Sequence, residues 1–263
     1  MSVLITCEVG GDAVPTQLVS PKLRSSINME APEGKRKLHA GRLPPRLGYD
    51  EAARHVVNRM CSNIQATLVS NKYSMDLVDV SRSMRHQQLF PLKTRKWSKT
   101  DKQTLLDTIY HPYRTEVRDT IQQMLRRSDQ VVHLSLRTFP LRSIGKKRSP
   151  GKKRSAGKVR RADMGLLYDP ACVDELELCV DWIDEMWDEV PMLRVRRNYP
   201  RRGTVDSITK AMRTEFTGQN YLGIELLLNQ AWAGRKVAVR DEVIDGICWT
   251  LQTILGNDIA KAA

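Results

Sequence analysis

Three side chains that could do chemistry share one face of a predicted strand over residues 131–139, VVHLSLRTF. Successive side chains of a strand point to opposite faces, so His133, Ser135 and Arg137 lie together and the leucines between them face the other way. The apolar run ends at Pro140 and predicts a buried strand in the middle of a sheet. Its polar face predicts a cleft, and the alternative is an edge strand with a solvated face.

Two carboxylates occupy comparable places at predicted strand ends. Glu8 follows a short strand over residues 3–7 and precedes a glycine pair, and Glu225 is the only acid in the apolar run 221–230. Open α/β sheets bind ligands at the carboxyl ends of their strands, which makes Glu8 a site candidate, with a turn or cap partner as the alternative. Glu225 and His133 are candidate acid–base catalysts, and the alternative for Glu225 is a buried ion pair with an arginine.

Guanidinium groups concentrate in the second half of the chain. Several arginines lie in residues 194–202, which form a predicted strand and the turn after it, and Arg213 lies on the next predicted helix. Arginine holds carboxylates through two parallel hydrogen bonds. These residues therefore predict a small acidic metabolite as the ligand rather than a polymer.

The elements that must position these residues alternate between strand and helix patterns. Predicted strands cover 3–7, 66–70, 76–80, 131–139, 164–168, 193–197 and 221–230. Predicted helices cover about 51–64, 102–109, 114–125, 173–187, 207–216 and 240–255. The alternation predicts one three-layer α/β domain over residues 1–263 with a central, mostly parallel sheet.

The sequence also predicts an N-cap, a break between two helices and the apolar face of a third helix. Asp50 occupies an N-cap position. A break at residues 111–114 separates the helical patterns on either side of it, and Pro112 favours a first helical turn there. Helix 173–187 is acidic and places Leu176, Val180, Ile183 and Trp187 on one face.

The basic charge of the chain is local. The formal net charge is +13, and ten Lys and Arg residues without an acid lie in residues 142–161, which leaves +3 for the rest. This segment repeats GKKRSP and GKKRSA and predicts a disordered insertion. Residues 145–161 could contact nucleic acid nonspecifically, and the alternative is a solvated surface loop.

Cysteine usage and hydropathy bear on the compartment. The five cysteines include no CxxC pair and predict free thiols in a reducing compartment. No signal peptide and no apolar run long enough to cross a membrane is apparent. The sequence therefore predicts a cytoplasmic protein with no membrane partner.

Motifs in order along almost the whole chain resemble the N-formylglutamate amidohydrolase family: TCEVGG (6–11), GYDEAA (48–53), LVDVSRS (77–83), HPYR (111–114), HLSLRTF (133–139), RRADMGLLYDP (160–170), VRRNYPRRGTVDSITKAMR (195–213) and YLGIELLLNQ (221–230). The resemblance implies a fold similar to zinc-dependent exopeptidases and hydrolysis of the amide of an N-acylated acidic amino acid by metal-activated water. It also implies a nearly intact substrate clamp formed by Arg196, Arg197, Asn198, Arg202, Gly203 and Thr204. Arg137 and Arg213 complete the set of candidate substrate-binding residues.

The departures from the family pattern fall on the implied zinc site. Val9 and Arg137 replace histidines that the resemblance would assign to the metal, Leu227 replaces a second glutamate, and Ser81 replaces an asparagine. Valine has no donor atom, and an arginine at that place would repel a cation. The donors that remain are Glu8, Asp50 and His133, so no metal-binding residue is assigned.

Three functions follow as alternatives. The first is an amidohydrolase-like protein with weak or lost activity, acting through a relocated metal or through Glu225 and His133 without one. The second is a non-catalytic binding or regulatory relative that keeps an arginine-lined carboxylate pocket. The third is a nucleic-acid-associated protein that acts through the basic segment. Fold resemblance alone does not choose among them.

Overall fold

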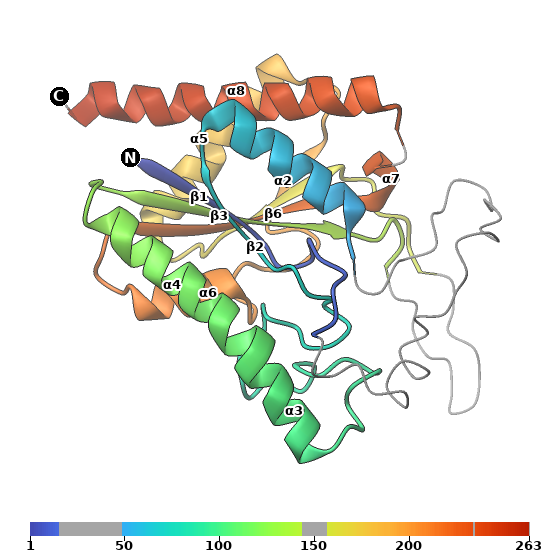
Figure 1. The fold of residues 1–263 in the computed structure, drawn as a ribbon. Helices are drawn as coiled ribbons and strands as arrows, with labels where there is room; N and C mark the ends of the chain where they lie inside the picture. Colours follow the sequence, from blue (N-terminus) through green and yellow to red (C-terminus); the bar gives the residue numbers. More distant parts are fainter. Residues whose placement is uncertain (16–48, 144–156, 234, 263) are drawn as a thin grey trace.

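A six-stranded, mostly parallel sheet forms the centre of the protein (Figure 1). The computed structural model describes residues 1–15, 49–143, 157–233 and 235–262. The strands lie in the order β2-β1-β3-β6-β4-β5, and only the β4–β6 pair is antiparallel. Their bounds are Ser2–Cys7 (β1), Thr67–Ser70 (β2), Val131–Phe139 (β3), Met164–Leu167 (β4), Val195–Arg197 (β5) and Tyr221–Asn229 (β6). The predicted α/β class is confirmed.

Helices cover both faces of the sheet, which gives three layers (Figure 1). One face packs on α2 (Glu51–Ile64), α5 (Val173–Glu189) and α8 (Val237–Ala262). The other face packs on α3 (Lys99–Leu105), α4 (His111–Leu125) and α6 (Ile208–Glu215). A short helix, α7 (Gln230–Ala233), follows β6.

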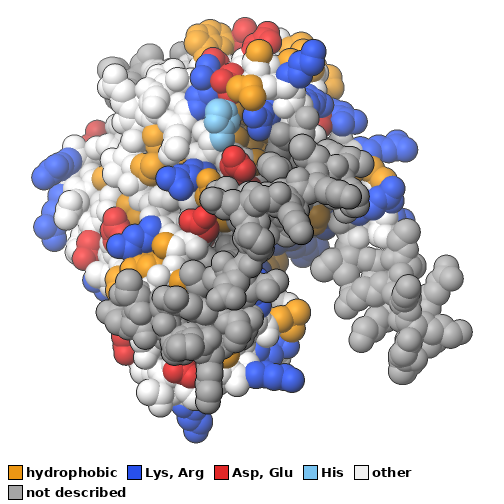
Figure 2. All heavy atoms as spheres, turned by 45° about the vertical axis from the view of Figure 1, so that its right-hand side comes forward, with side chains coloured by type: hydrophobic (Ala, Val, Ile, Leu, Met, Phe, Trp, Pro, Cys, Tyr) orange, Lys and Arg blue, Asp and Glu red, His pale blue; other side chains and the backbone are white. Residues whose placement is uncertain are grey.

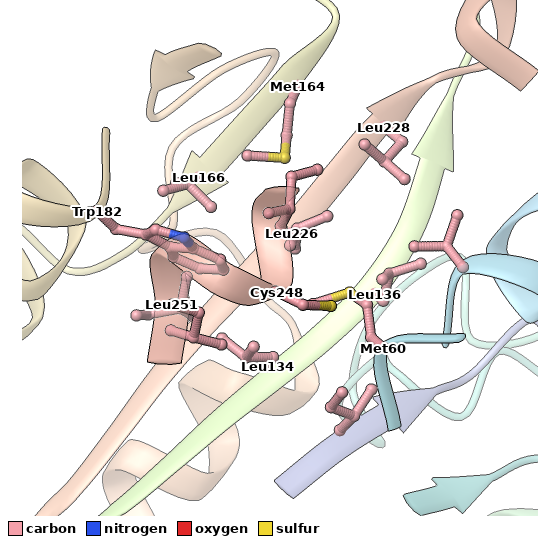
Figure 3. Close-up of a cluster of buried hydrophobic side chains, with 14 of the residues drawn as sticks. Met60, Leu134, Leu136, Met164, Leu166, Trp182, Leu226, Leu228, Cys248 and Leu251 are labelled. Carbon is pink, nitrogen blue, oxygen red and sulfur yellow. The ribbon is translucent and has the colours of Figure 1, made fainter. Parts of the chain in front are cut away.

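The alternating sequence of β3 sends its two sets of side chains into different layers. Leu134 and Leu136 join leucines of β6 and the side chains of Trp182 and Cys248 in the larger apolar cluster (Figure 3). His133 and Ser135 face the other layer and are buried. Strand β3 lies between β1 and β6, so the edge-strand alternative is wrong.

Two predicted features of residues 76–114 are wrong. Residues 76–80 form turns instead of a strand, because their backbone groups bond to nearby loops, as in the bond from Asp79 N to Leu89 O (2.9 Å). No break occurs at 111–114, since α3 continues through a π-helical turn, Leu106–Tyr110, into α4. A π-helical turn shifts the hydrogen-bond pattern just ahead of Pro112, which has no N–H to donate.

Helix α5 buries a different face from the one that the sequence suggested. Its buried apolar residues are Leu178, Cys179, Trp182 and Met186, whereas Trp187 is 76% exposed. The helix has two apolar stripes, and the stripe that carries Trp182 is the fully buried one. Leu176 and Ile183 of the predicted face pack only partly against the same core.

The ends of the basic segment are paired with each other. Arg142 and Val159 form an antiparallel bridge, and Ser143 N donates to Lys158 O at 2.9 Å. Residues 144–156 lie outside the described residues, and so does most of the predicted disordered insertion. On the face seen in Figure 2, Lys and Arg side chains lie interspersed with Asp and Glu.

Candidate functional site

A row of polar side chains crosses three adjacent strands near their carboxyl ends. The register places Thr6 of β1 beside Ser135 of β3, and Ser135 beside Glu225 of β6. Glu8 follows β1 by one residue. The parallel pairing therefore brings together side chains that are more than 200 residues apart in the sequence.

Glu8 is the acceptor at the centre of this row. Its carboxylate accepts hydrogen bonds from Thr6 (2.8 Å), Ser135 (2.9 Å) and Tyr113 (3.3 Å), and the side chain is fully buried. Burial raises the pKa of Glu8 above its usual value, and the nearby charge of Arg137 opposes that rise. Glu8 therefore holds three elements together through its carboxylate, rather than capping a turn.

His133 is bonded at both ring nitrogens. Nε2 lies 2.8 Å from Thr6 Oγ1, and Nδ1 lies 2.7 Å from the Tyr221 hydroxyl. Because Thr6 donates to Glu8, its oxygen accepts from Nε2–H, so Nδ1 accepts from Tyr221. Burial lowers the pKa of His133 to about 3, and the charge of Arg213 adds to this effect. The imidazole is therefore neutral at physiological pH and has no free nitrogen.

Arg137 is held among carboxylates where the family resemblance implied a histidine. Its guanidinium lies 3.7 Å from Glu8 and 3.4 Å from Asp79, and it donates to Ser81 Oγ at 3.0 Å. Burial disfavours the charged guanidinium and so lowers its pKa. The negative charges of Asp79 and Glu8 have the larger, opposite effect, so the pKa of Arg137 is raised above its usual value. Burial also opposes ionisation of Asp79, yet Arg137, Ser81 and Arg82 together lower its pKa. The result is a fixed internal cation.

Glu225 forms the ion pair that the sequence left as an alternative. It is 1% exposed, and one carboxylate oxygen pairs with Arg201. The other oxygen, Oε1, and the second terminal nitrogen of Arg201, Nη1, are buried without a hydrogen-bond partner among the described residues. The assignment of Glu225 as a catalytic residue stays a prediction.

The predicted substrate-binding residues divide into an internal and an exposed set. Arg213 donates to Glu175 (2.7 Å), to Gly203 O (3.0 Å) and to Gly223 O, so it anchors the fold. Asn198 Oδ1 accepts from Gly203 N at 2.7 Å and shapes the turn. Gly203 allows close approach, because a Cβ there would lie 2.4 Å from the backbone nitrogen of Tyr168.

The exposed set lies on β5 and the turn after it and comprises Arg196, Arg197, Arg202 and Thr204. Arg196 stacks over the ring of Tyr199 at 5.8 Å. Within the described ranges, none of these three arginines takes part in an ion pair. They keep guanidinium donors available to a solvent-borne anion.

The donors that the resemblance implied for zinc do not fit that ion. Asp50 caps α2 through Ala53 N (3.0 Å) and also accepts from Thr138 N (3.2 Å), while Glu8 and His133 are bonded as above. Zinc sites take three or four free His, Cys or carboxylate donors. Within the part of the chain that the structure describes, no group of three such residues could hold a metal ion.

Sequence reasoning missed several members of this cluster. Asp79 fell inside a predicted strand, although an acid between apolar residues of a short run is itself a signal. Arg201 was one arginine among several in its turn, and nothing local marks it as the partner of Glu225. Thr6 and Tyr221 became visible only through the register of the strands.

Two surface cavities lie away from the polar row. One of about 520 Å³ and another of about 470 Å³ open at the amino ends of the strands, where Ser2 and Asn220 line them. Arg127 lines both cavities and is the only charged side chain of the larger one. Neither cavity contains a residue of the polar row.

Comparison with known proteins identifies the family. The family model described as N-formylglutamate amidohydrolase matches residues 2–230. The chain belongs to this family. Residues 2–230 include the polar row, Arg137 and the arginine turn, so Val9 and Arg137, the positions where the expected pattern has histidines, lie inside the matched range.

Solved structures share the fold at low sequence identity. A crystal structure of a gene product from Agrobacterium tumefaciens is 17% identical with a TM-score of 0.69, and the match covers 96% of this chain and 91% of that one. N-formylglutamate amidohydrolase from Ralstonia eutropha is 17% identical with a TM-score of 0.60, covering 99% and 94%. No curated protein matches the chain significantly. Among the described residues of this amidohydrolase-family protein, no helix has the length and apolar character to span a membrane.

Proposed function

We propose that this member of the N-formylglutamate amidohydrolase family binds a small acidic molecule and has weak or no metal-dependent hydrolytic activity. The observation that carries the proposal is the position of Arg137, whose guanidinium is bonded between Glu8 and Asp79. The positive charge beside these two carboxylates is therefore the guanidinium of Arg137 and not a bound metal ion. The family's amide hydrolysis would need free donors that Glu8, Asp50 and His133 do not offer.

Electrostatics supports the loss of the metal. Two unit charges about 4 Å apart repel by about 4 kcal/mol at an effective dielectric constant near 20, and a divalent ion doubles that figure. A zinc ion beside Arg137 would also have to displace the hydrogen bonds that Glu8 accepts from Thr6 and Ser135. The binding free energy of zinc would therefore include an unfavourable contribution of several kcal/mol.

Binding of an acidic ligand is supported by the exposed set Arg196, Arg197 and Arg202. Carboxylates pair with arginine in a bidentate way, and the turn that carries these residues is fixed by Asn198 and Gly203. A dicarboxylate such as an N-acylated acidic amino acid offers two groups to this wall. The ligand class thus follows from charge and from the family.

The test uses the full chain purified without added zinc. Metal analysis should find substoichiometric zinc, N-formyl-L-glutamate should release little or no formate, and calorimetry should detect its binding. Arg202→Ser should weaken this binding, while Arg118→Ser, an exposed arginine on α4, should leave it unchanged. Stoichiometric zinc that disappears together with formate release in Asp50→Asn would overturn the proposal.

A matched variant can restore the donors. Val9→His combined with Arg137→His returns both histidines that the family resemblance implies, and Val9→Ala combined with Arg137→Gln serves as its control. We expect the first variant to retain zinc and the control to retain none. Equal zinc content in wild type and both variants would show that Arg137 does not decide metal binding.

Two further predictions accompany this function. We propose a cytoplasmic location, which is supported by five free cysteines. We also propose that residues 145–161 contact nucleic acid nonspecifically, on the strength of their charge alone.

A further inference from the structure

The ion pair between Glu225 and Arg201 leaves one polar atom of each side chain without a partner. The pair joins Glu225 Oε2 to Arg201 Nη2, whereas Glu225 Oε1 and Arg201 Nη1 are buried and have no hydrogen-bond partner among the described residues. Arginine and carboxylate groups often pair through two parallel hydrogen bonds, which would occupy all four atoms. Because the two groups touch through their other terminal atoms, the unpaired oxygen and the unpaired nitrogen are neighbours in space.

These two atoms lie between the polar row and the exposed arginines. Glu225 is paired in register with Ser135 of β3, and it is 1% exposed. Arg201 belongs to the turn that also carries the exposed Arg202, and its side chain is 25% exposed. The side chain of Arg201 therefore links the solvent-exposed turn to the buried carboxylate, and a ligand held by the neighbouring arginines has a short path to both unpaired atoms.

The chemistry of the unpaired atoms limits what can complete the site. Buried polar atoms without a partner are rare in folded proteins, because each has given up its hydrogen bonds to water. The ion pair carries no net charge, so a charged group added beside it would be buried without a counterion, which is strongly unfavourable. The completing group is therefore uncharged, with one hydrogen-bond donor for Glu225 Oε1 and one acceptor for Arg201 Nη1.

We propose that Glu225 and Arg201 bind a primary carboxamide, and that the ligand is a carbamoyl derivative of an acidic amino acid. A primary carboxamide has an N–H donor and a C=O acceptor on the same edge, so it pairs with both unpaired atoms at once. A formyl or acetyl amide in the trans form has its N–H and C=O on opposite edges and pairs with only one of them. The inference rests on the proposed function, because the carboxylates of this ligand bind the exposed arginines Arg196, Arg197 and Arg202.

The direct test compares N-carbamoyl-, N-acetyl- and N-formyl-L-glutamate by calorimetry on the full chain. Carbamoyl and acetyl groups are similar in size and differ by NH2 in place of CH3, so this comparison isolates the carboxamide edge. The carbamoyl compound should bind at least about tenfold more tightly than either of the others, as expected for hydrogen bonds to charged groups. Equal affinities for all three would overturn this inference alone and would assign the two atoms to a bound water. No binding of any of them would overturn the proposed function as well.

Two lysine substitutions in the same turn locate the contact. Arg201→Lys keeps a positive charge for Glu225 but removes the second terminal nitrogen, so the preference for the carbamoyl over the acetyl compound should disappear. Arg202→Lys is the matched control, and it should weaken binding of both compounds while their ratio of affinities stays as in wild type. A preference that persists in Arg201→Lys, or that Arg202→Lys removes equally, refutes the assignment. The ligand comparison uses wild type, so it decides the inference even if Arg201→Lys does not fold.

Discussion

Acidification should destabilise the protein through His133. Burial, with a contribution from the charge of Arg213, lowers the pKa of this histidine from 6.5 to about 3. The unfolded chain therefore binds a proton before the folded one does. The stability that neutral His133 contributes is complete above pH 6.5 and is lost as the pH falls toward 3.

The size of the effect follows from the shift. One pKa unit corresponds to about 1.4 kcal/mol, so the whole shift corresponds to about 5 kcal/mol of unfolding free energy. About 3 kcal/mol of this should be lost between pH 7 and pH 4. Glu8 acts with the opposite sign, because its raised pKa contributes stability that is present at low pH and lost as the pH rises.

The assay is urea unfolding at pH 7 and pH 4 for wild type and for His133→Gln. Glutamine keeps one donor and one acceptor but does not titrate. Both proteins contain Glu8, so the difference between their pH dependences isolates the histidine. We expect wild type to lose about 3 kcal/mol more than the variant on going to pH 4.

Two results would refute this reasoning. One is an NMR titration that finds the pKa of His133 in the folded protein near its usual value. The other is an equal loss of stability in wild type and in His133→Gln. Either result would mean that water reaches the imidazole, and His133 would again be a candidate to carry protons in catalysis.

Three other perturbations test the division between structural and binding residues. Arg213→Met should cost about 3–5 kcal/mol in urea unfolding, because it leaves the buried carboxylate of Glu175 unpaired; Arg202→Met should cost little, and equal losses would contradict the division. Asp50→Ala should cost about 1–2 kcal/mol, since it removes the cap of α2, and a negligible loss would mean that another group caps the helix. Replacing the six Lys and Arg residues of 146–154 with serine should abolish salt-sensitive retention of nucleic acid on a column without changing the melting temperature, and retention that survives would place the contact elsewhere.

Much of the fold could be predicted because the residue pattern of several segments fits only one type of secondary structure. The run 131–139 has strand periodicity and a proline at its end, and it forms β3 in the middle of the sheet. Asp50 precedes a clear helical pattern and caps α2 through Ala53 N. In both places local propensity and tertiary packing agree.

Where prediction failed, the deciding partner lay far away in the sequence. Residues 76–80 have apolar content typical of a strand but find loop partners instead of a sheet neighbour. The two stripes of α5 are similar in hydropathy, and only packing on the sheet and α8 selects the one that carries Trp182. Arg201 could be assigned to Glu225 only after the strands were in register. Choices of this kind depend on three-dimensional packing that a local pattern does not contain.

The bridge between Arg142 and Val159 has a consequence for how the gene can change. The two ends of the basic segment pair with each other, so the number of residues between them does not change the positions of the neighbouring strands. Closing a loop twice as long costs only about 0.6 kcal/mol more. Tandem GKKRSP and GKKRSA units are therefore free to multiply or shrink by replication slippage, and the cationic content of the chain can drift without a penalty to its architecture.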